Sequence, residues 1–300
     1  MDEVLHKKAR KPMDSSERSI RIIAYVFLLL LSLIALLPFL HVISKGFSSG
    51  VDVTAGNVTF WPKRFQTETI SFILKGTTFL TALKNTLIIT VIGTTLSMVI
   101  TITTAYPLSK STFRGRKVIS FLYVFSMIFY GGIIPAYMVV KTLGIFDTFW
   151  ACILPFVIVQ FNMFIVKNFF EALPEEIEES ARIDGASDIR MLWSIICPMS
   201  LPVIATVGLL YAVNYWNNYL HAMMYTRSES MKTLQVYLYG IINSSSEIAM
   251  NLASGSKMTN LTSQGLVAAA VSLSVLPIIA IYPFVQRFLI KGLTIGSVKG

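Results

Sequence analysis

Six long runs of apolar residues dominate this sequence of 300 residues. They cover approximately residues 20–44, 79–108, 117–140, 148–169, 199–223 and 264–289. A helix needs about 20 apolar residues to cross a hydrocarbon core of about 30 Å. Because 54% of the residues are hydrophobic and only 14% are charged, the chain has too little polar surface for a soluble protein of this size. The sequence therefore predicts an all-α integral membrane protein with six transmembrane helices.

The basic residues indicate the orientation of the chain. If the N-terminus is cytoplasmic, 16 of the 25 Lys and Arg residues fall on cytoplasmic segments, which positive charge favours. We therefore predict a cytoplasmic segment at 1–19, a membrane domain at 20–290 and a cytoplasmic tail at 291–300. The net charge of +9 comes from the ends of the apolar runs and not from a basic domain, which argues against nucleic-acid binding.

Several kinds of functional residue are absent from the sequence. No charged residue lies near the middle of a predicted span, where ion-coupled transporters place them. The sequence has no G-x-x-x-x-G-K-[ST] phosphate loop and no catalytic arrangement of side chains. Cys152 and Cys197 lack the spacing of a metal site and are predicted near opposite membrane faces. We predict a chain that is not an enzyme, holds no metal or cofactor, and takes any energy for transport from a partner.

An acidic segment separates the fourth and fifth predicted spans. Residues 171–188 hold seven of the 16 acidic residues of the chain. Pro174 suits the start of a helix, and Gly185 is expected to end it. An ion pair between Glu178 and Arg182 would support this helix. A second short helix can begin at Ser187 or Asp188, and its apolar residues recur at helical spacing: Ile189, Leu192, Trp193 and Ile196. Residues 171–198 are therefore predicted to form a cytoplasmic helix-turn-helix loop.

The order of residues in this segment resembles the EAA motif of ABC-importer permeases. That motif reads E-A-A, three residues, G, nine residues and then I-x-L-P. Here it reads Glu179-Ser180-Ala181, then Gly185, then Ile195-Ile196-Cys197-Pro198, with Ser180 and Cys197 as conservative departures. The resemblance implies that the segment docks on a cytoplasmic ATPase, which binds ATP and Mg, through Glu179, Ser180, Ala181, Asp184, Gly185, Ala186 and Pro198. The alternative is an acidic loop that is merely solvated.

Two further stretches narrow the resemblance. The run at 285–300 is similar to the ending of the maltose-type second permease subunit, which implies that the tail contacts the ATPase through Lys291, Gly292, Gly296, Lys299 and Gly300. The stretch at 130–145 resembles permeases that import oligosaccharides such as alginate, uronate or pectin fragments. The implied partners are a second homologous permease subunit, two ATPase subunits and an extracellular solute-binding protein. The implied location is the bacterial cytoplasmic (inner) membrane.

Aromatic and amide side chains near the outer end of the fifth predicted span are candidates for contact with a sugar. Aromatic faces and amides suit the CH faces and hydroxyl groups of carbohydrates. Helical spacing predicts a common face for Tyr215, Asn218 and Tyr219. The complete set of candidates is Tyr215, Trp216, Asn218 and Tyr219, followed by the weaker Tyr130 and Tyr137. Such residues also anchor helices at membrane interfaces, so that alternative stays open.

Together these features predict a transmembrane permease subunit of an ABC importer that moves an oligosaccharide or polysaccharide fragment into the cytoplasm by alternating access. Two loops, a polar one at 225–263 and a long one at 45–78, are predicted to be external and to approach the binding protein; a solvated linker is the alternative for the polar loop. Two rival functions remain open. One is an ion-coupled secondary transporter or channel, and the other is a membrane scaffold or receptor that transports nothing.

Overall fold

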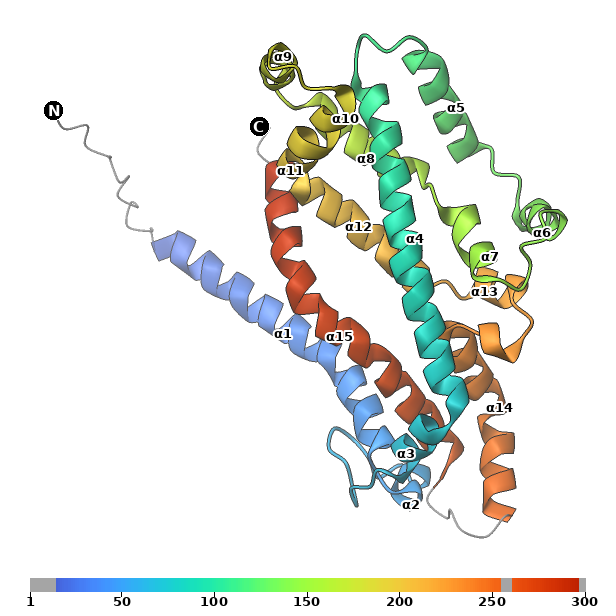
Figure 1. Ribbon diagram of the computed structural model, residues 1–300. Helices are drawn as coiled ribbons and strands as arrows, with labels where there is room; N and C mark the ends of the chain where they lie inside the picture. Colours follow the sequence, from blue (N-terminus) through green and yellow to red (C-terminus); the bar gives the residue numbers. More distant parts are fainter. Residues whose placement is uncertain (1–14, 255–260, 297–300) are drawn as a thin grey trace.

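The computed structural model describes residues 15–254 and 261–296, and every regular element within these ranges is a helix (Figure 1). The longest helices are α1 (Ser15–Gly46), α4 (Thr77–Ser109) and α15 (Ser263–Gly296). The shorter ones, in chain order, are α2 (Gly50–Thr54), α3 (Glu68–Lys75), α5 (Arg116–Ile128), α6 (Ile133–Thr142), α7 (Phe149–Ile153), η1 (Leu154–Phe156), α8 (Gln160–Glu171), α9 (Glu175–Ile183), α10 (Asp188–Met191), η2 (Leu192–Ile196), α11 (Cys197–Met199), α12 (Leu201–Trp216), α13 (Leu220–Tyr225), η3 (Glu229–Met231) and α14 (Leu234–Ser254).

Three helices are long and apolar enough to cross a membrane without a break, namely α1, α4 and the first part of α15. The other predicted spans are pairs of helices that meet at an angle. The angle is 113° between α5 and α6, 51° between the segment Phe149–Phe156 and α8, and 86° between the segment Asp188–Met199 and α12. The described helices therefore provide three spans, or up to six if each bent pair is one span, and the count of six stays a prediction.

Two of the breaks coincide with residues that disfavour a continuous helix. Gly132 lies between α5 and α6 at φ +91°, a conformation that a residue with a Cβ atom rarely adopts. Pro155 lies in η1, where its missing N–H cannot join a helical ladder. Broken helices are tolerated in membrane proteins where neighbouring protein groups satisfy the freed backbone atoms.

Helix α4 forms the centre of the fold, where it packs against α8 and α12 (Figure 1). Its buried residues include Gly93, Ser97, Thr101 and Ala105, which recur at intervals of four and share one face of the helix. Small residues on such a face let a neighbouring helix approach closely. In lipid, hydrophobic burial does not drive helices together, so this close packing stabilises their association instead. The face of α4 toward α12 is therefore built for tight packing.

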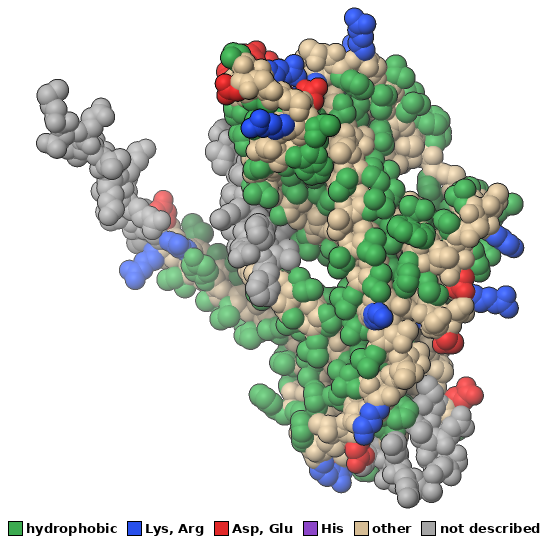
Figure 2. Space-filling view, viewed as in Figure 1, with side chains coloured by type: hydrophobic (Ala, Val, Ile, Leu, Met, Phe, Trp, Pro, Cys, Tyr) green, Lys and Arg blue, Asp and Glu red, His purple; other side chains and the backbone are tan. Residues whose placement is uncertain are grey.

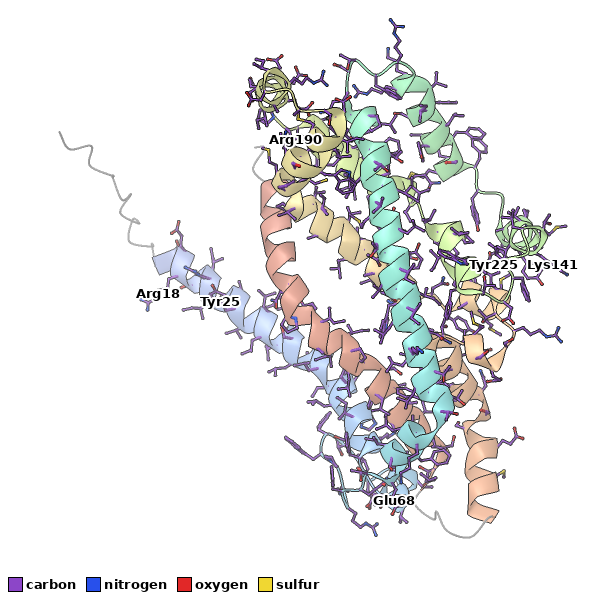
Figure 3. All side chains as sticks on the ribbon, viewed as in Figure 1. Arg18, Tyr25, Glu68, Lys141, Arg190 and Tyr225 are labelled. Carbon is purple, nitrogen blue, oxygen red and sulfur yellow. The ribbon has the colours of Figure 1, made fainter. Side chains whose placement is uncertain are left out.

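Helix α1 packs along part of α15 and otherwise stands away from the body of the protein (Figure 1). None of its apolar window is buried within the chain. Figure 2 shows hydrophobic side chains over the long helices, with charged side chains at the two ends and also along the side of α6, where Figure 3 labels Lys141. The apolar cover over the long helices is typical of a protein whose middle faces lipid.

The short helices α2 and α3 and the longer helix α14 lie together at one end of the molecule (Figure 1). Asp52 in α2 binds Arg64 at 2.7 Å, and the hydrogen bonds from this guanidinium lower the pKa of Asp52 to about 2. The region 225–263, predicted as a polar loop, contains the 21-residue helix α14. This helix contradicts the alternative of a solvated linker, because Leu234, Tyr237 and Leu238 lie at helical spacing and pack into a cluster with residues of α3, α4 and α15.

Candidate functional site

The acidic segment folds as two short helices around a glycine turn. Helix α9 ends in a Schellman motif, in which Ala186 N–H donates to the Ala181 carbonyl at 2.9 Å and Gly185 N–H donates to the Arg182 carbonyl at 3.0 Å. Gly185 adopts φ +79°, as the left-handed position of this motif requires. Ser187 then caps α10, because its side chain accepts a hydrogen bond from Arg190 N–H.

This segment lies at one end of the molecule, opposite the cluster of α2 and α3. Figure 3 shows Arg190 of α10 at this end and Glu68 of α3 at the other. The C-terminal end of α4 and the start of α5 lie at the same end as α9 and α10 (Figure 1). The segment therefore caps the central helix instead of extending from a separate domain.

Buried apolar side chains of the acidic segment pack against the helical body. Ala181, Met191, Leu192 and Ile196 belong to the same hydrophobic cluster as Phe170 of α8. The predicted apolar stripe is correct for Leu192 and Ile196 but wrong for Ile189 and Trp193, which are exposed. The reason is that α10 has only four residues and continues into η2, a π-helical turn whose period differs from the α-helical spacing assumed.

Ion pairs fasten the segment as well. Glu178 pairs with Lys110 at the end of α4, so the predicted pair of Glu178 with Arg182 is wrong. Arg182 instead lies 3.6 Å from Asp188, across the glycine turn. An ion pair between residues four apart in a helix depends only on helical spacing. Lys110, the observed partner of Glu178, lies 68 positions earlier in the chain and is brought close by the fold.

The outer part of the segment presents a mixed acidic and apolar surface. Among the sequence-predicted contact residues, Glu179, Ser180, Asp184, Gly185 and Pro198 are exposed, Ala186 is half-buried and Ala181 is buried. Two large apolar side chains that the sequence reasoning did not select are also exposed here, Ile183 at 86% and Ile189 at 74%. Exposed apolar groups of this size, surrounded by acidic side chains, are typical of a surface that docks on another protein.

A ladder of hydrogen bonds links α4 and α12 in the centre of the fold. The hydroxyl groups of Tyr211 and Thr101 lie 2.8 Å apart, and those of Tyr215 and Ser97 lie 2.9 Å apart. The sequence reasoning did not identify this ladder, although each helix carries its two members at a spacing of four residues, which would have been the signal.

The same two tyrosines also form hydrogen bonds with backbone groups beside the bend in the fourth predicted span. Val159 N–H donates to the Tyr211 hydroxyl at 3.0 Å, and the Tyr215 hydroxyl donates to the Ile153 carbonyl at 3.3 Å. Both backbone groups flank the bend between the segment Phe149–Phe156 and α8. The ladder therefore connects α12, which continues from the acidic segment, to two neighbouring helices.

The structure places the six candidate sugar-contact residues in different surroundings. Tyr215 is only 3% exposed and Trp216 is also buried, both against helices of the same chain. Since α12 ends at Trp216, the prediction that Tyr215 shares a helix face with Asn218 and Tyr219 is wrong. Among the remaining candidates, Asn218 is half-buried, the ring of Tyr219 is 5.0 Å from that of Tyr239, Tyr130 is exposed, and Tyr137 stacks on Tyr225.

The predicted C-terminal contact residues lie partly in a helix. Lys291, Gly292 and Gly296 belong to α15, which continues to Gly296, so the first six residues of the predicted tail extend the last long helix. Lys299 and Gly300 lie outside the described residues. Within the parts of the chain that the structure describes, no group of three His, Cys, Asp or Glu residues is arranged to hold a metal ion.

Comparison with known proteins identifies relatives along almost the whole chain. Residues 98–295 match the family described as "Binding-protein-dependent transport system inner membrane component". Protein LplC of Bacillus subtilis is 43% identical over 269 residues, which cover 89% of this chain and 90% of LplC. The polygalacturonan/rhamnogalacturonan transport system permease protein YtcP of the same organism is 39% identical over 276 residues, which cover 92% of this chain and 96% of YtcP.

A solved structure is similar over the same extent. It is described as a bacterial ABC transporter involved in the import of the acidic polysaccharide alginate, and the matching chain is 34% identical with a TM-score of 0.84. The match covers 92% of this chain and 98% of that chain. The arrangement of helices described above is therefore shared with a protein of that kind.

Proposed function

Because this chain belongs to the family of inner membrane components of binding-protein-dependent transport systems, we propose that it forms one half of the membrane pathway of an ATP-driven importer. Its proposed cargo is an oligosaccharide or polysaccharide fragment, and more narrowly one that carries acidic sugars. The substrates named for YtcP and for the solved transporter, polygalacturonan/rhamnogalacturonan and alginate, support this narrower class. Neither the family nor these relatives support the ion-coupled alternative.

The acidic segment at 171–198 is the observation that carries the proposal. An element that couples two proteins must be fixed to one of them and exposed to the other. Here Met191, Leu192 and Ile196 anchor the segment in the core, while Glu179 and Ile183 are exposed beyond it. We propose that an ATPase subunit covers this exposed surface, with Glu179, Ser180, Asp184 and Ala186 at the contact and Ala181 and Pro198 supporting it.

The proposed complex contains this chain, a second homologous permease subunit, two ATPase subunits and an extracellular solute-binding protein. The ATPase subunits would bind ATP and Mg, so this chain needs no catalytic residues or cofactor of its own. Both termini and the acidic segment would lie in the cytoplasm, and the cluster of α2, α3 and α14 would face the binding protein. Lys291, Gly292, Gly296, Lys299 and Gly300 would add a C-terminal contact with the ATPases.

The path of the proposed motion follows from the packing. Closure of the ATPase pair would shift α9 and α10, and α12 would follow because the segment Asp188–Met199 leads directly into it. The hydrogen bonds of Tyr211 and Tyr215 would carry the shift to α4 and α8. A rigid rocking of these packed helices is the kind of transition that exposes a site alternately to the two sides of a membrane.

Reconstitution of the complete transporter tests this proposal. We expect ATP-dependent uptake of oligogalacturonate into proteoliposomes that contain this chain and its partners, and little uptake of neutral maltodextrin. Glu179→Lys should reduce both uptake and substrate-stimulated ATP hydrolysis by at least about tenfold, because it reverses an exposed charge in the proposed contact. Glu17→Lys, a charge reversal at the exposed start of α1 and outside both proposed contact surfaces, is the matched control.

Three results would contradict the proposal. Uptake and ATP hydrolysis that are unchanged in Glu179→Lys would remove the coupling role of the segment. Uptake that is driven by an ion gradient without ATP would favour a secondary transporter. An assembled complex that moves no solute under any condition would favour a scaffold or receptor.

A further inference from the structure

A basic pocket lies at the same end of the molecule as the acidic segment, between the start of α5 and the C-terminal part of α8. Its volume is about 660 Å³, and it is lined by Ser111, Phe113, Gly115, Arg116, Lys117, Val118, Ser120 and Lys167. None of these residues belongs to the proposed ATPase contact. The pocket therefore requires its own explanation.

The pocket has more positive charge than its neighbours neutralise. Glu171 pairs with both Lys167, at 2.7 Å, and Arg116, so one carboxylate serves two cations. The side chain of Lys167 is only 10% exposed, which makes an excess of positive charge costly. Lys117 also lines the pocket and has no carboxylate partner among the residues that the structure describes. An anion in the pocket would offset this excess.

Polar groups in the pocket wall are suited to the same anion. Helix α5 has 13 residues, begins at Arg116, and receives no hydrogen bond from a capping side chain. The N-terminal end of a helix carries partial positive charge and attracts phosphate groups. Independently of the helix end, the Ser120 hydroxyl is buried and has no hydrogen-bond partner among the described residues. Cationic side chains, a helix terminus and an unpartnered hydroxyl therefore converge on one cavity.

An apolar track leads away from the pocket along α5. Val118 lines the pocket, and Val118, Phe121, Leu122 and Phe125 are all exposed. Their positions at i, i+3, i+4 and i+7 place them on one face of the helix. No residue of α5 is buried within the chain. A free phosphate ion would leave this track unused, whereas an acyl chain attached to the phosphate would cover it.

We propose that this pocket binds the phosphate group of an anionic phospholipid, with its acyl chains along the exposed face of α5. Arg116, Lys117 and Lys167 provide the positive charge, and Ser120 provides a hydroxyl donor. Basic pockets between membrane helices are suited to lipid head groups of this kind. The inference depends on the membrane location of the chain and not on its import role, so a failure of one leaves the other intact.

Lipid titration of the complete transporter, purified through a tag on this chain and stripped of lipid in detergent, tests the site by native mass spectrometry. We expect phosphatidylglycerol to bind more tightly than phosphatidylcholine with the same acyl chains. Lys117→Gln should weaken phosphatidylglycerol binding about fivefold, as expected for one basic residue near a membrane surface. Arg114→Gln removes the same charge from an exposed neighbour that does not line the pocket, and should change binding less than twofold.

A second variant distinguishes a lipid from a free anion. Phe121→Ser should weaken binding of phosphatidylglycerol while leaving the charge of the pocket unchanged. The proposal is wrong if Lys117→Gln and Arg114→Gln weaken binding equally, because the attraction would then be diffuse. It is also wrong if Phe121→Ser has no effect and millimolar inorganic phosphate displaces the lipid, since the pocket would then hold a free phosphate ion.

Discussion

Substitution of Gly185 should loosen the acidic segment by an amount that depends only on backbone conformation. The glycine adopts φ +79°, and a Cβ atom added to it would meet no atom within 4 Å, so steric clash contributes nothing. A residue with a Cβ atom in this left-handed region costs about 1 to 2 kcal/mol. Asn tolerates the region better than Ala, and a β-branched residue tolerates it worse. The expected order of disruption is therefore Gly185→Val, then Gly185→Ala, then Gly185→Asn.

Hydrogen exchange at the Ala186 amide measures this cost directly. That N–H donates to the Ala181 carbonyl, and the bond exists only while the glycine turn is intact. For Gly185→Ala, a cost of about 1 to 2 kcal/mol corresponds to exchange about 5 to 30 times faster. For Gly185→Asn the increase should stay below about threefold. If the turn also couples the segment to an ATPase, substrate-stimulated ATP hydrolysis should decline in the same order.

A matched glycine provides the control for this series. Gly240 lies within α14, does not have positive φ, and also has no atom within 4 Å of an added Cβ. Gly240→Ala should leave exchange at Ala186 unchanged. Equal exchange in Gly185→Ala and the unsubstituted chain, or a larger effect of Asn than of Val, would refute the reasoning.

Three further predictions concern the helical body and the opposite end. Tyr211→Phe removes the acceptor for Val159 N–H and should destabilise the complex by about 1 to 3 kcal/mol, measured as a lower thermal midpoint in detergent; an unchanged midpoint would show that the ladder is not stabilising. An added Cβ at Gly93 would lie 2.8 Å from the ring of Tyr215, so Gly93→Ala should lower the midpoint in the unsubstituted background but not further in a Tyr215→Leu background. Because Arg64 lowers the pKa of Asp52 to about 2, the stabilisation from their pair should be fully present above the ordinary carboxyl pKa of about 3.9 and should decline as the pH falls toward 2. Amide exchange across residues 47–66 should show this loss of protection, and Asp52→Asn should abolish its dependence on pH.

The sequence alone identified the class of protein because that class depends on local properties. A membrane span requires about 20 apolar residues whose backbone hydrogen bonds are satisfied within the helix, and both requirements are visible in a linear sequence. The spacing from Glu179 through Gly185 to Pro198 is equally local, and the helices and turn formed by this segment depend on neighbours in the chain. The family match and the alginate transporter structure support the resemblance drawn from those residues.

Only the tertiary structure decided which residues meet. The partner of Glu178 is Lys110 and not Arg182, since an ion pair forms with whichever opposite charge the fold brings closest. Tyr215 is a buried member of the α4–α12 ladder and not an open aromatic face, because Gly93 and Ser97 allow its ring to pack against α4. The basic pocket likewise combines residues from two segments about fifty positions apart. Contacts of this kind depend on distances across the fold, which hydropathy and spacing along the chain do not contain.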